Sequence, residues 1–347
     1  MFQSFNVTSE KSKGADRVKA LRQKLKDLNL DAFVVPHSDE HQNEYLPIRA
    51  ERLAWLTGFT GSAGFAVILA KRALVFTDGR YTLQVEQQTD ETVFETGNSV
   101  TVEGTLGIKE WGAKNMRIGI DPWLHTMESI DSLRKQAEHI GAELVHLKAN
   151  PIDEIWDDQP DPPRGMVKIH GTEFAGTAPK PKLNEIGKTV RESGADVTVL
   201  TDPNSICWAF NIRGLDVVHT PLVLAFAIVP AKGDPKLFID MQKLGTEEHA
   251  YLNQLCDLYE PEQFDEHLNM LGEYKTKVLL DPSLVAMKLA TTLEDAGAEI
   301  IKGVDPCRLP RARKNKTERK GAIEAHKRDG AAMVSFLAWL DSQKPED

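Results

Sequence analysis

A series of landmarks occurs twice in this sequence, in the same order. The first copy carries them at residues 31–36, 55–58, 73–78, 117–122 and 141–144, and the second at residues 194–200, 208–214, 236–240, 277–282 and 297–300. In both copies, for example, a short apolar run ends in Asp-Pro, at Asp121 and again at Asp281. An ordered recurrence of this kind predicts a duplicated domain. Residues 316–340 then begin a helical pattern that has no earlier counterpart.

Length and composition agree with the duplication. A chain of 347 residues fits about two domains of roughly 150 residues and a remainder. The net charge is -10 and neither copy has a dense basic run, which argues against nucleic acid or an anionic membrane surface as a partner. No apolar run approaches the roughly 20 residues of a membrane span, and residues 1–4 do not begin a signal peptide. Three widely spaced cysteines favour neither a disulfide framework nor a metal knuckle, so we expect the protein to be located in the reducing cytoplasm.

Local patterns predict helices alternating with strands in each copy. Residues 18–28 repeat apolar side chains at helical spacing, whereas residues 32–35 form a short, continuous apolar run typical of a strand covered on both faces. Residues 65–69 and 73–77 are separated by only three residues, which predicts a hairpin. A hairpin among strands otherwise separated by helices predicts a mixed sheet flanked by helices. The expected fold is therefore α/β, as two tandem domains.

Proline and glycine mark the expected domain boundaries. Residues 159–165 separate the two copies, and a second boundary falls at residues 304–313. We therefore expect domains at residues 1–160 and 165–305, followed by the start of a third unit at residues 311–347.

The third unit opens with a predicted helix. Thr317 is its expected N-cap residue. Its apolar face includes Ile323, Ala331, Val334, Phe336, Leu337 and Leu340. A face of this kind requires an apolar partner.

Most candidate catalytic motifs fail on their context. Residues 58–64 are rich in glycine, but they lead into a strand, whereas phosphate-binding loops lead into a helix. Ser62 within them lacks the surroundings of a nucleophile and is better interpreted as a turn hydroxyl. Residues 37–41 contain two histidines without the helical spacing that brings two imidazoles to one metal ion, and we expect a polar loop there.

Two other sites are candidates for function. Arg80 follows a strand and an Asp-Gly turn. Its guanidinium either forms an ion pair at the surface or reaches the carboxylate of a ligand, which can also be bound in a neighbouring subunit. Arg213, Asp216 and His219 lie in a loop with glycine and proline between apolar strands. We expect this loop to dock one domain on the other, with a catalytic role as the alternative.

Three stretches resemble the Xaa-Pro aminopeptidases, the aminopeptidase P family. Residues 52–64, together with residues 77–81, resemble its N-terminal domain, and residues 208–221 resemble the second, creatinase-like domain of the long three-domain form. Residues 316–330 resemble the helix that opens the family's pita-bread catalytic domain. The resemblance covers nearly the whole chain and identifies both copies as similar to creatinase N-terminal domains.

The resemblance implies a metallo-aminopeptidase that releases the N-terminal residue from peptides with proline in second position. Such an enzyme carries two divalent metal ions, usually manganese. A dedicated enzyme is needed because the proline nitrogen lacks a proton and its ring restricts the backbone. The family's metal ligands lie well inside the third domain, so this chain is expected to end before them. No catalytic or metal-binding residue is expected here, and the chain by itself is expected to be inactive.

Two functions of different class follow from the resemblance. In the first, these domains shape the cleft of an aminopeptidase, support a homodimer and admit only short proline-containing peptides. Because the family's first domain takes part in dimer contacts, Arg80 would then contact substrate. In the second, the chain is part of a non-enzymatic protein-binding module descended from an aminopeptidase. Intact metal ligands beyond residue 347 would favour the enzyme, and missing carboxylates would favour the binding module.

Overall fold

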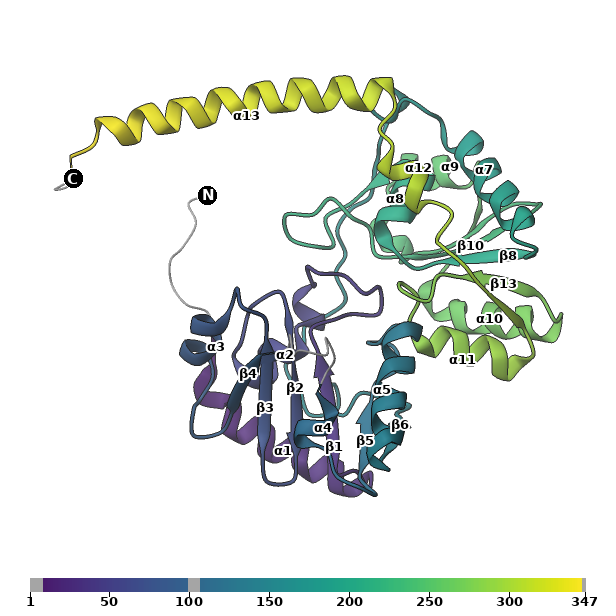
Figure 1. The fold of residues 1–347 in the computed structure, drawn as a ribbon. Helices are drawn as coiled ribbons and strands as arrows, with labels where there is room; N and C mark the ends of the chain where they lie inside the picture. The colour runs from purple at the N-terminus through teal and green to yellow at the C-terminus, as the bar shows by residue number, and fades with distance from the viewer. Residues whose placement is uncertain (1–8, 99–106, 345–347) are drawn as a thin grey trace.

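The computed structural model describes residues 9–98 and 107–344, which form two α/β domains and one long projecting helix (Figure 1). The expectations for residues 1–4 and for the last three residues lie outside these ranges.

The first domain is built on a six-stranded mixed sheet with the order β4-β3-β2-β1-β5-β6. Its strands are β1 (Ala32–Pro36), β2 (Gly64–Leu69), β3 (Ala73–Thr77), β4 (Glu95–Asn98), β5 (Arg117–Ile120) and β6 (Glu143–His146). Its helices are η1 (Lys11–Lys13), α1 (Gly14–Asp27), η2 (Ile48–Ala50), α2 (Arg52–Thr57), α3 (Thr82–Gln88), α4 (Ile108–Trp111) and α5 (Met127–Ile140). The expected hairpin is confirmed, because β2 and β3 pair antiparallel.

The central strand β1 shows why this sheet is covered on both faces. Successive side chains of a strand point to opposite faces. Phe33 and Val35 pack in the core under α1 and α2, while Ala32 and Val34 pack in a second core under α4 and α5. A continuous apolar run is therefore what a strand in this position requires.

The second domain repeats the architecture with the sheet order β12-β11-β10-β8-β13-β14. Its strands are β8 (Val197–Leu200), β10 (Phe226–Pro230), β11 (Lys236–Phe238), β12 (Asp257–Tyr259), β13 (Lys277–Leu280) and β14 (Glu299–Lys302). Its helices are α7 (Pro179–Glu192), α8 (Pro203–Phe210), η3 (Met241–Lys243), α9 (Thr246–Leu252), η4 (Pro261–Gln263), α10 (Phe264–Glu273) and α11 (Met287–Ala296). Both sheets have parallel pairs at their two ends and antiparallel pairs around the hairpin.

The predicted duplication is confirmed by this common topology and by equivalent residues. Trp55 lies in α2 and Trp208 in the equivalent helix α8. Each tryptophan is followed three residues later by a left-handed C-cap, Gly58 with φ 85° and Asn211 with φ 51°. Glycine and asparagine are the residues that adopt this conformation most readily.

Smaller elements join the second domain to the C-terminal helix. The short strands β7 (Lys168–Ile169) and β9 (Ile212–Arg213) form a two-stranded sheet. Helix α12 (Arg308–Ala312) directly precedes α13 (Lys316–Ser342), and α6 (Thr172–Ala175) lies beside the start of α13.

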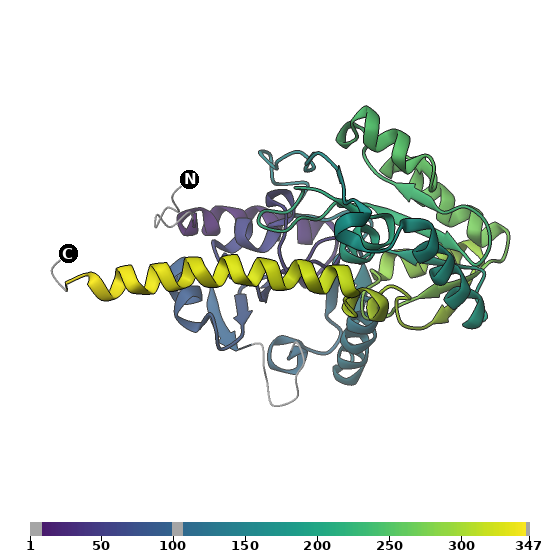
Figure 2. The ribbon, with the colours of Figure 1, turned by 90° about the horizontal axis from the view of Figure 1, so that it is seen from above.

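Helix α13 begins at residue 316 as expected, but its capping residue differs from the prediction. Its N-cap is Asn315, whose side chain accepts hydrogen bonds from the backbone N–H groups of Thr317 and Glu318, at 2.9 and 3.0 Å. The Glu318 carboxylate in turn accepts a hydrogen bond from the Asn315 N–H, which completes a capping box. The expectation that Thr317 caps the helix is therefore wrong, because Thr317 already lies in the first turn. The helix then leaves the second domain and passes over the first (Figures 1 and 2).

Candidate functional site

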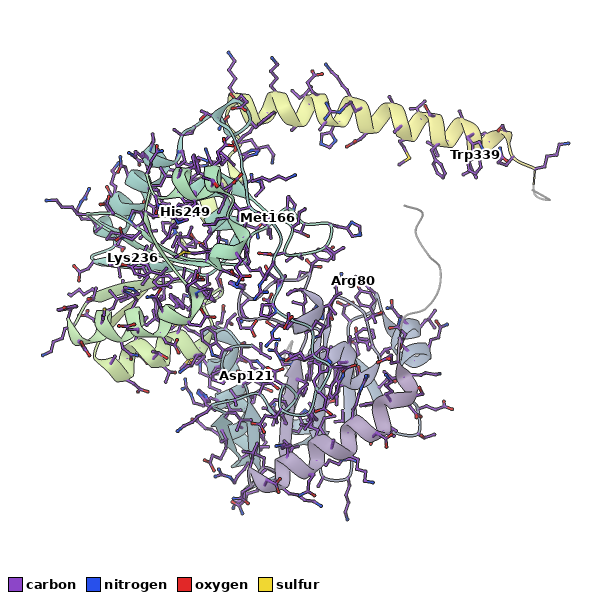
Figure 3. All side chains as sticks on the ribbon, turned by 180° about the vertical axis from the view of Figure 1, so that it is seen from behind. Arg80, Asp121, Met166, Lys236, His249 and Trp339 are labelled. Carbon is purple, nitrogen blue, oxygen red and sulfur yellow. The ribbon has the colours of Figure 1, made fainter. Side chains whose placement is uncertain are left out.

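Arg80 lies at the surface of the first domain, where β3 ends. Its Nη2 donates to Asp78 Oδ2 at 2.8 Å, and its backbone N–H donates to Asp78 Oδ1 at 3.0 Å. This pairing lowers the pKa of the Asp78 carboxyl group, chiefly through the side-chain hydrogen bond. The Arg80 side chain is still 60% exposed. Figure 3 shows it at the end of the first domain that faces α13.

The glycine-rich segment lies next to Arg80. Ser62 Oγ and the Tyr81 hydroxyl are 2.9 Å apart, and the Arg80 guanidinium lies 5.0 Å from the centre of the Tyr81 ring. Gly61 packs so closely on Phe59 that an added Cβ would lie 2.3 Å from its ring. The segment is thus a tight connection with a turn hydroxyl, and it presents Arg80 and Tyr81 on one surface.

Asp216 is buried in the second domain. Its carboxylate accepts hydrogen bonds from Lys243 Nζ at 2.8 Å and from the N–H groups of Leu224 and Gly165, at 2.7 and 2.9 Å. Gly165 belongs to the linker between the copies. Asp216 therefore fastens the end of the linker to the second domain.

The two other residues of that loop have different surroundings. Arg213 Nη1 donates to the carbonyl groups of Cys207 and Ile212, and its side chain lines a depression beside the start of α13. His219 is exposed and has a left-handed backbone, with φ 61°. The proposed docking and substrate roles of these residues and of Arg80 stay predictions.

The two domains meet through equivalent segments of the duplication. The N–H of Met127 donates to the Val285 carbonyl, and the N–H of Met287 donates to the His125 carbonyl. A second reciprocal pair of hydrogen bonds runs from the N–H of Glu128 to the Pro282 carbonyl and from the N–H of Lys288 to the Pro122 carbonyl. Each of these four hydrogen bonds has a counterpart with the roles of the copies exchanged, as in the isologous interface of a symmetric dimer.

A second contact comes from the polar loop after β1. His41 Nδ1 lies 2.9 Å from the Thr201 carbonyl oxygen, and its ring stacks on Phe226 with ring centres 4.4 Å apart. Asp39 shapes the loop by accepting hydrogen bonds from His41 and Asn43. The sequence predicted a polar loop, but no signal in it showed that the loop contacts the other domain.

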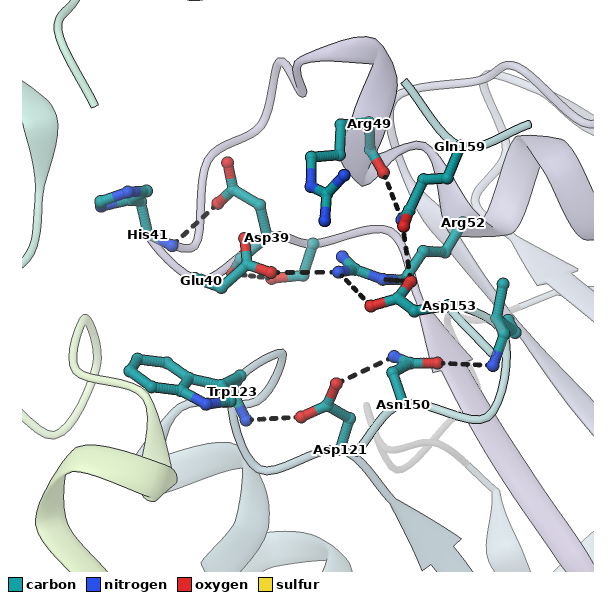
Figure 4. A network of polar contacts seen from close by, with 12 residues as sticks. Asp39, Glu40, His41, Arg49, Arg52, Asp121, Trp123, Asn150, Asp153 and Gln159 are labelled. Carbon is teal, nitrogen blue, oxygen red and sulfur yellow. Dashed lines mark hydrogen bonds and ion pairs between the residues drawn. The ribbon is translucent and has the colours of Figure 1, made fainter. Parts of the chain in front are cut away.

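A polar network supports this junction from the first domain (Figure 4). The Arg52 side chain is only 5% exposed and forms two hydrogen bonds with the Asp153 carboxylate and one with Glu40. Asp121 accepts hydrogen bonds from the Trp123 N–H and from Asn150 Nδ2. Burial raises the pKa of Asp121, and these two hydrogen bonds oppose the shift.

The described residues do not fit a dinuclear metal centre. Across residues 9–98 and 107–344, no group of three or more histidine, cysteine, aspartate or glutamate side chains is arranged to hold a metal ion. We therefore assign no step of metal chemistry to them. None of the helices in the same ranges is long and apolar enough to cross a membrane.

Comparison with known proteins defines the class of both domains. Models of the creatinase/prolidase N-terminal domain match residues 17–155 and residues 158–318. An X-prolyl aminopeptidase from Caenorhabditis elegans, described as a cytosolic enzyme with a di-nuclear active site, has the same fold. Its TM-score is 0.87 at 24% identity, over 94% of this chain and 56% of that one.

Curated relatives define the family. A probable Xaa-Pro aminopeptidase P from Talaromyces stipitatus is 33% identical over 98% of this chain and 53% of that protein. Aminopeptidase P2 from Arabidopsis thaliana is 30% identical over 91% of this chain and 49% of that protein. The chain belongs to the Xaa-Pro aminopeptidase P family and carries two of its creatinase-type N-terminal domains. It spans about half the length of the curated relatives it matches.

Proposed function

We propose that this chain is the N-terminal, non-catalytic portion of a metallo-aminopeptidase that releases the N-terminal residue from peptides with proline in second position. The observation that carries the proposal is the 33% identity to a probable Xaa-Pro aminopeptidase P along 98% of the chain. That relative is about twice as long, since the match spans 53% of it. The proposal assigns the two divalent metal ions, with manganese as the expected metal, to the part of the protein outside this chain.

The exposed side of α13 supports a further domain. Seven large apolar side chains on this helix are each about half exposed or more: Ile323, Met333, Val334, Phe336, Leu337, Trp339 and Leu340. An apolar stripe of this size normally packs against another surface. We assign residues 311–347 to the start of the catalytic domain, after domains at residues 1–160 and 165–305.

The two described domains would then control access to the cleft and contribute to a homodimer. Their firm attachment to one another suits this role, because a rigid pair can hold Arg80 at a fixed position relative to α13. The three cysteines are buried and free, which supports a reducing cytoplasm as the site of action.

The test is an activity measurement on the longer protein. We expect it to release the N-terminal residue from a short Xaa-Pro peptide, and to lose this activity when a chelator removes divalent metal. A peptide with alanine in place of proline is the matched control and should be cleaved far more slowly. The 347-residue chain should be inactive on both peptides. A longer protein that binds manganese and leaves the Xaa-Pro peptide intact would contradict the proposal and favour a protein-binding module.

A further inference from the structure

A cavity of about 440 Å³ lies between the two domains, away from Arg80. Residues 40–52 of the first domain form one wall, and residues that follow the carboxyl ends of β11 and β12 form the other. The proline-rich linker closes a third side with residues 162–164. This volume is in the range of small-molecule sites, which commonly lie between domains and beyond the carboxyl ends of parallel strands.

Two arginines of the first domain line this cavity. Arg49 Nη1 donates to the Pro160 carbonyl at 2.7 Å, and Arg52 is held by Asp153 and Glu40. In Figure 4 the Arg49 guanidinium points toward that of Arg52. The two carboxylates neutralise the charge of Arg52, whereas the carbonyl group bonded to Arg49 is uncharged.

Arg52 also has a donor that nothing uses. Its Nη1 is buried, and within the described part of the chain it has no hydrogen-bond partner. Because this atom has almost no accessible surface, a ligand in the cavity does not reach it, and Arg49 is the arginine that can pair with a ligand carboxylate.

The opposite wall has the complementary charge. Glu260 and Glu262 of the second domain line it. The other charged groups there are already paired: Arg164 with Asp240, at 3.1 Å, and Lys243 with the buried Asp216. On the first domain Glu40 also lines the cavity and is paired with Arg52, so Arg49 is the basic group there that faces Glu260 and Glu262. This arrangement suits a ligand with a negative and a positive end.

The cavity also has an apolar surface between the charged walls. Phe226 and Phe238 line it and belong to one aromatic cluster, since both rings pack on Phe264. We propose that this cavity binds a small zwitterion with an apolar side chain, that is, a free amino acid or a dipeptide. Arg49 would hold its carboxylate, Glu260 and Glu262 its ammonium group, and Phe226 its side chain.

The experiment measures binding of matched probes to the purified 347-residue chain by titration calorimetry. L-Phenylalanine carries both charges, phenylacetate lacks the ammonium group, and phenethylamine lacks the carboxylate. We expect L-phenylalanine to bind with a dissociation constant roughly tenfold or more below that of either analogue. The dipeptide Ala-Phe tests whether the ligand is a dipeptide or a free amino acid. Its ammonium and carboxylate groups are farther apart than those of L-phenylalanine, so the spacing of the charged residues in the cavity should favour one of these two probes.

Variants connect binding to this cavity. Arg49→Ala and Glu262→Gln should each weaken binding of the preferred zwitterion about tenfold or more, since each removes one charged contact. Arg72→Ala, which removes an exposed arginine paired with Glu95 on the same domain, is the matched control and should bind normally. The proposal is overturned if neither L-phenylalanine nor Ala-Phe binds, if phenylacetate binds as tightly as both, or if Arg49→Ala binds like the wild type. Because no activity is measured, failure here would leave the proposed peptidase function untouched.

Discussion

Arg80 and Asp216, two charged residues that the sequence singled out, have opposite surroundings. The Arg80 side chain is 60% exposed and pairs with a carboxylate two residues away. The Asp216 side chain is 0% exposed and is bonded to a buried lysine and two backbone N–H groups. Arg80 can exchange its partner for a ligand at little cost. Asp216 cannot, because its loss would leave the charge of Lys243 buried and unpaired.

For Arg80 we predict an effect on catalysis in the longer protein. Arg80→Ala should lower kcat/KM on a short Xaa-Pro peptide about tenfold to a hundredfold, because a charged contact to the substrate is lost. Arg80→Lys should recover only part of it, since a lysine lacks the planar fork. Arg72→Ala is the control, an exposed arginine paired with Glu95. If Arg80→Ala keeps wild-type kcat/KM and dimerisation, Arg80 is only a surface residue.

For Asp216 we predict an effect on stability. Asp216→Ala leaves the Lys243 ammonium group buried and unpaired, and breaking a buried pair in this way costs about 3–5 kcal/mol. Urea denaturation of the 347-residue chain measures the change in the free energy of unfolding. Asp257→Ala removes the partner of a more exposed ion pair with Lys236 and should cost about 1 kcal/mol or less. Equal losses in the two variants would contradict the structural role assigned to Asp216.

At the scale of elements, the sequence predicted those strands and helices that a short local pattern marks. The strand at residues 32–35 and the hairpin of β2 and β3 were predictable, because a continuous apolar run and a three-residue connection are patterns within a short stretch of sequence. The capping residue of α13 was mispredicted although the sequence carries a signal for it, since Asn315 has Glu318 at the third position of a capping box. Thr317 has a lysine at that position. The contact of His41 with Thr201 joins residues 160 positions apart, and no periodicity encodes such a pair.

The exposed stripe of α13 gives a prediction for one side chain. In the 347-residue chain Leu337 is 49% exposed. Leu337→Ala should therefore change the free energy of unfolding by about 0.5 kcal/mol or less. In the longer protein the same substitution should cost about 2–5 kcal/mol, because the proposed catalytic domain would bury the leucine. Lys327→Ala, on an exposed part of the same helix, should be nearly neutral in both proteins. Equal effects of Leu337→Ala in both would show that the stripe stays uncovered.

At the scale of the whole molecule, the duplication determines how the domains are joined. The Asp-Pro segments that mark the two copies in the sequence are also the segments that contact one another, through reciprocal hydrogen bonds between residues 122–128 and 282–288. The sequence predicted the two copies but not this contact, because a recurring motif does not show that its copies touch. His125 lies in the middle of this junction, and it differs from its counterpart Val285 in carrying a titratable group.

This difference predicts that the junction weakens in mild acid. His125 is 5% exposed, and burial lowers its pKa from 6.5 to about 4, with nearby His146 acting in the same direction. The folded protein thus keeps the imidazole neutral where the unfolded chain binds a proton. The contribution of this effect to the free energy of unfolding is complete above about pH 6.5 and is lost as the pH falls towards 4. About 2 kcal/mol of it is lost between pH 7 and pH 5.

Urea denaturation at pH 7 and pH 5 measures this loss in the 347-residue chain. In His125→Gln the difference between the two pH values should be smaller by about 2 kcal/mol, because glutamine cannot bind the proton. His326→Gln removes an exposed histidine from α13 and should keep the full difference, which controls for the loss of an imidazole as such. The His125 carbonyl accepts the N–H of Met287, and the Pro122 carbonyl accepts the N–H of Lys288. Protection of these two amides, that is, their exchange rate relative to the intrinsic rate at the same pH, should therefore also fall at pH 5 in the wild type. An unchanged pH dependence in His125→Gln would show that this imidazole does not couple acid to the contact between the domains.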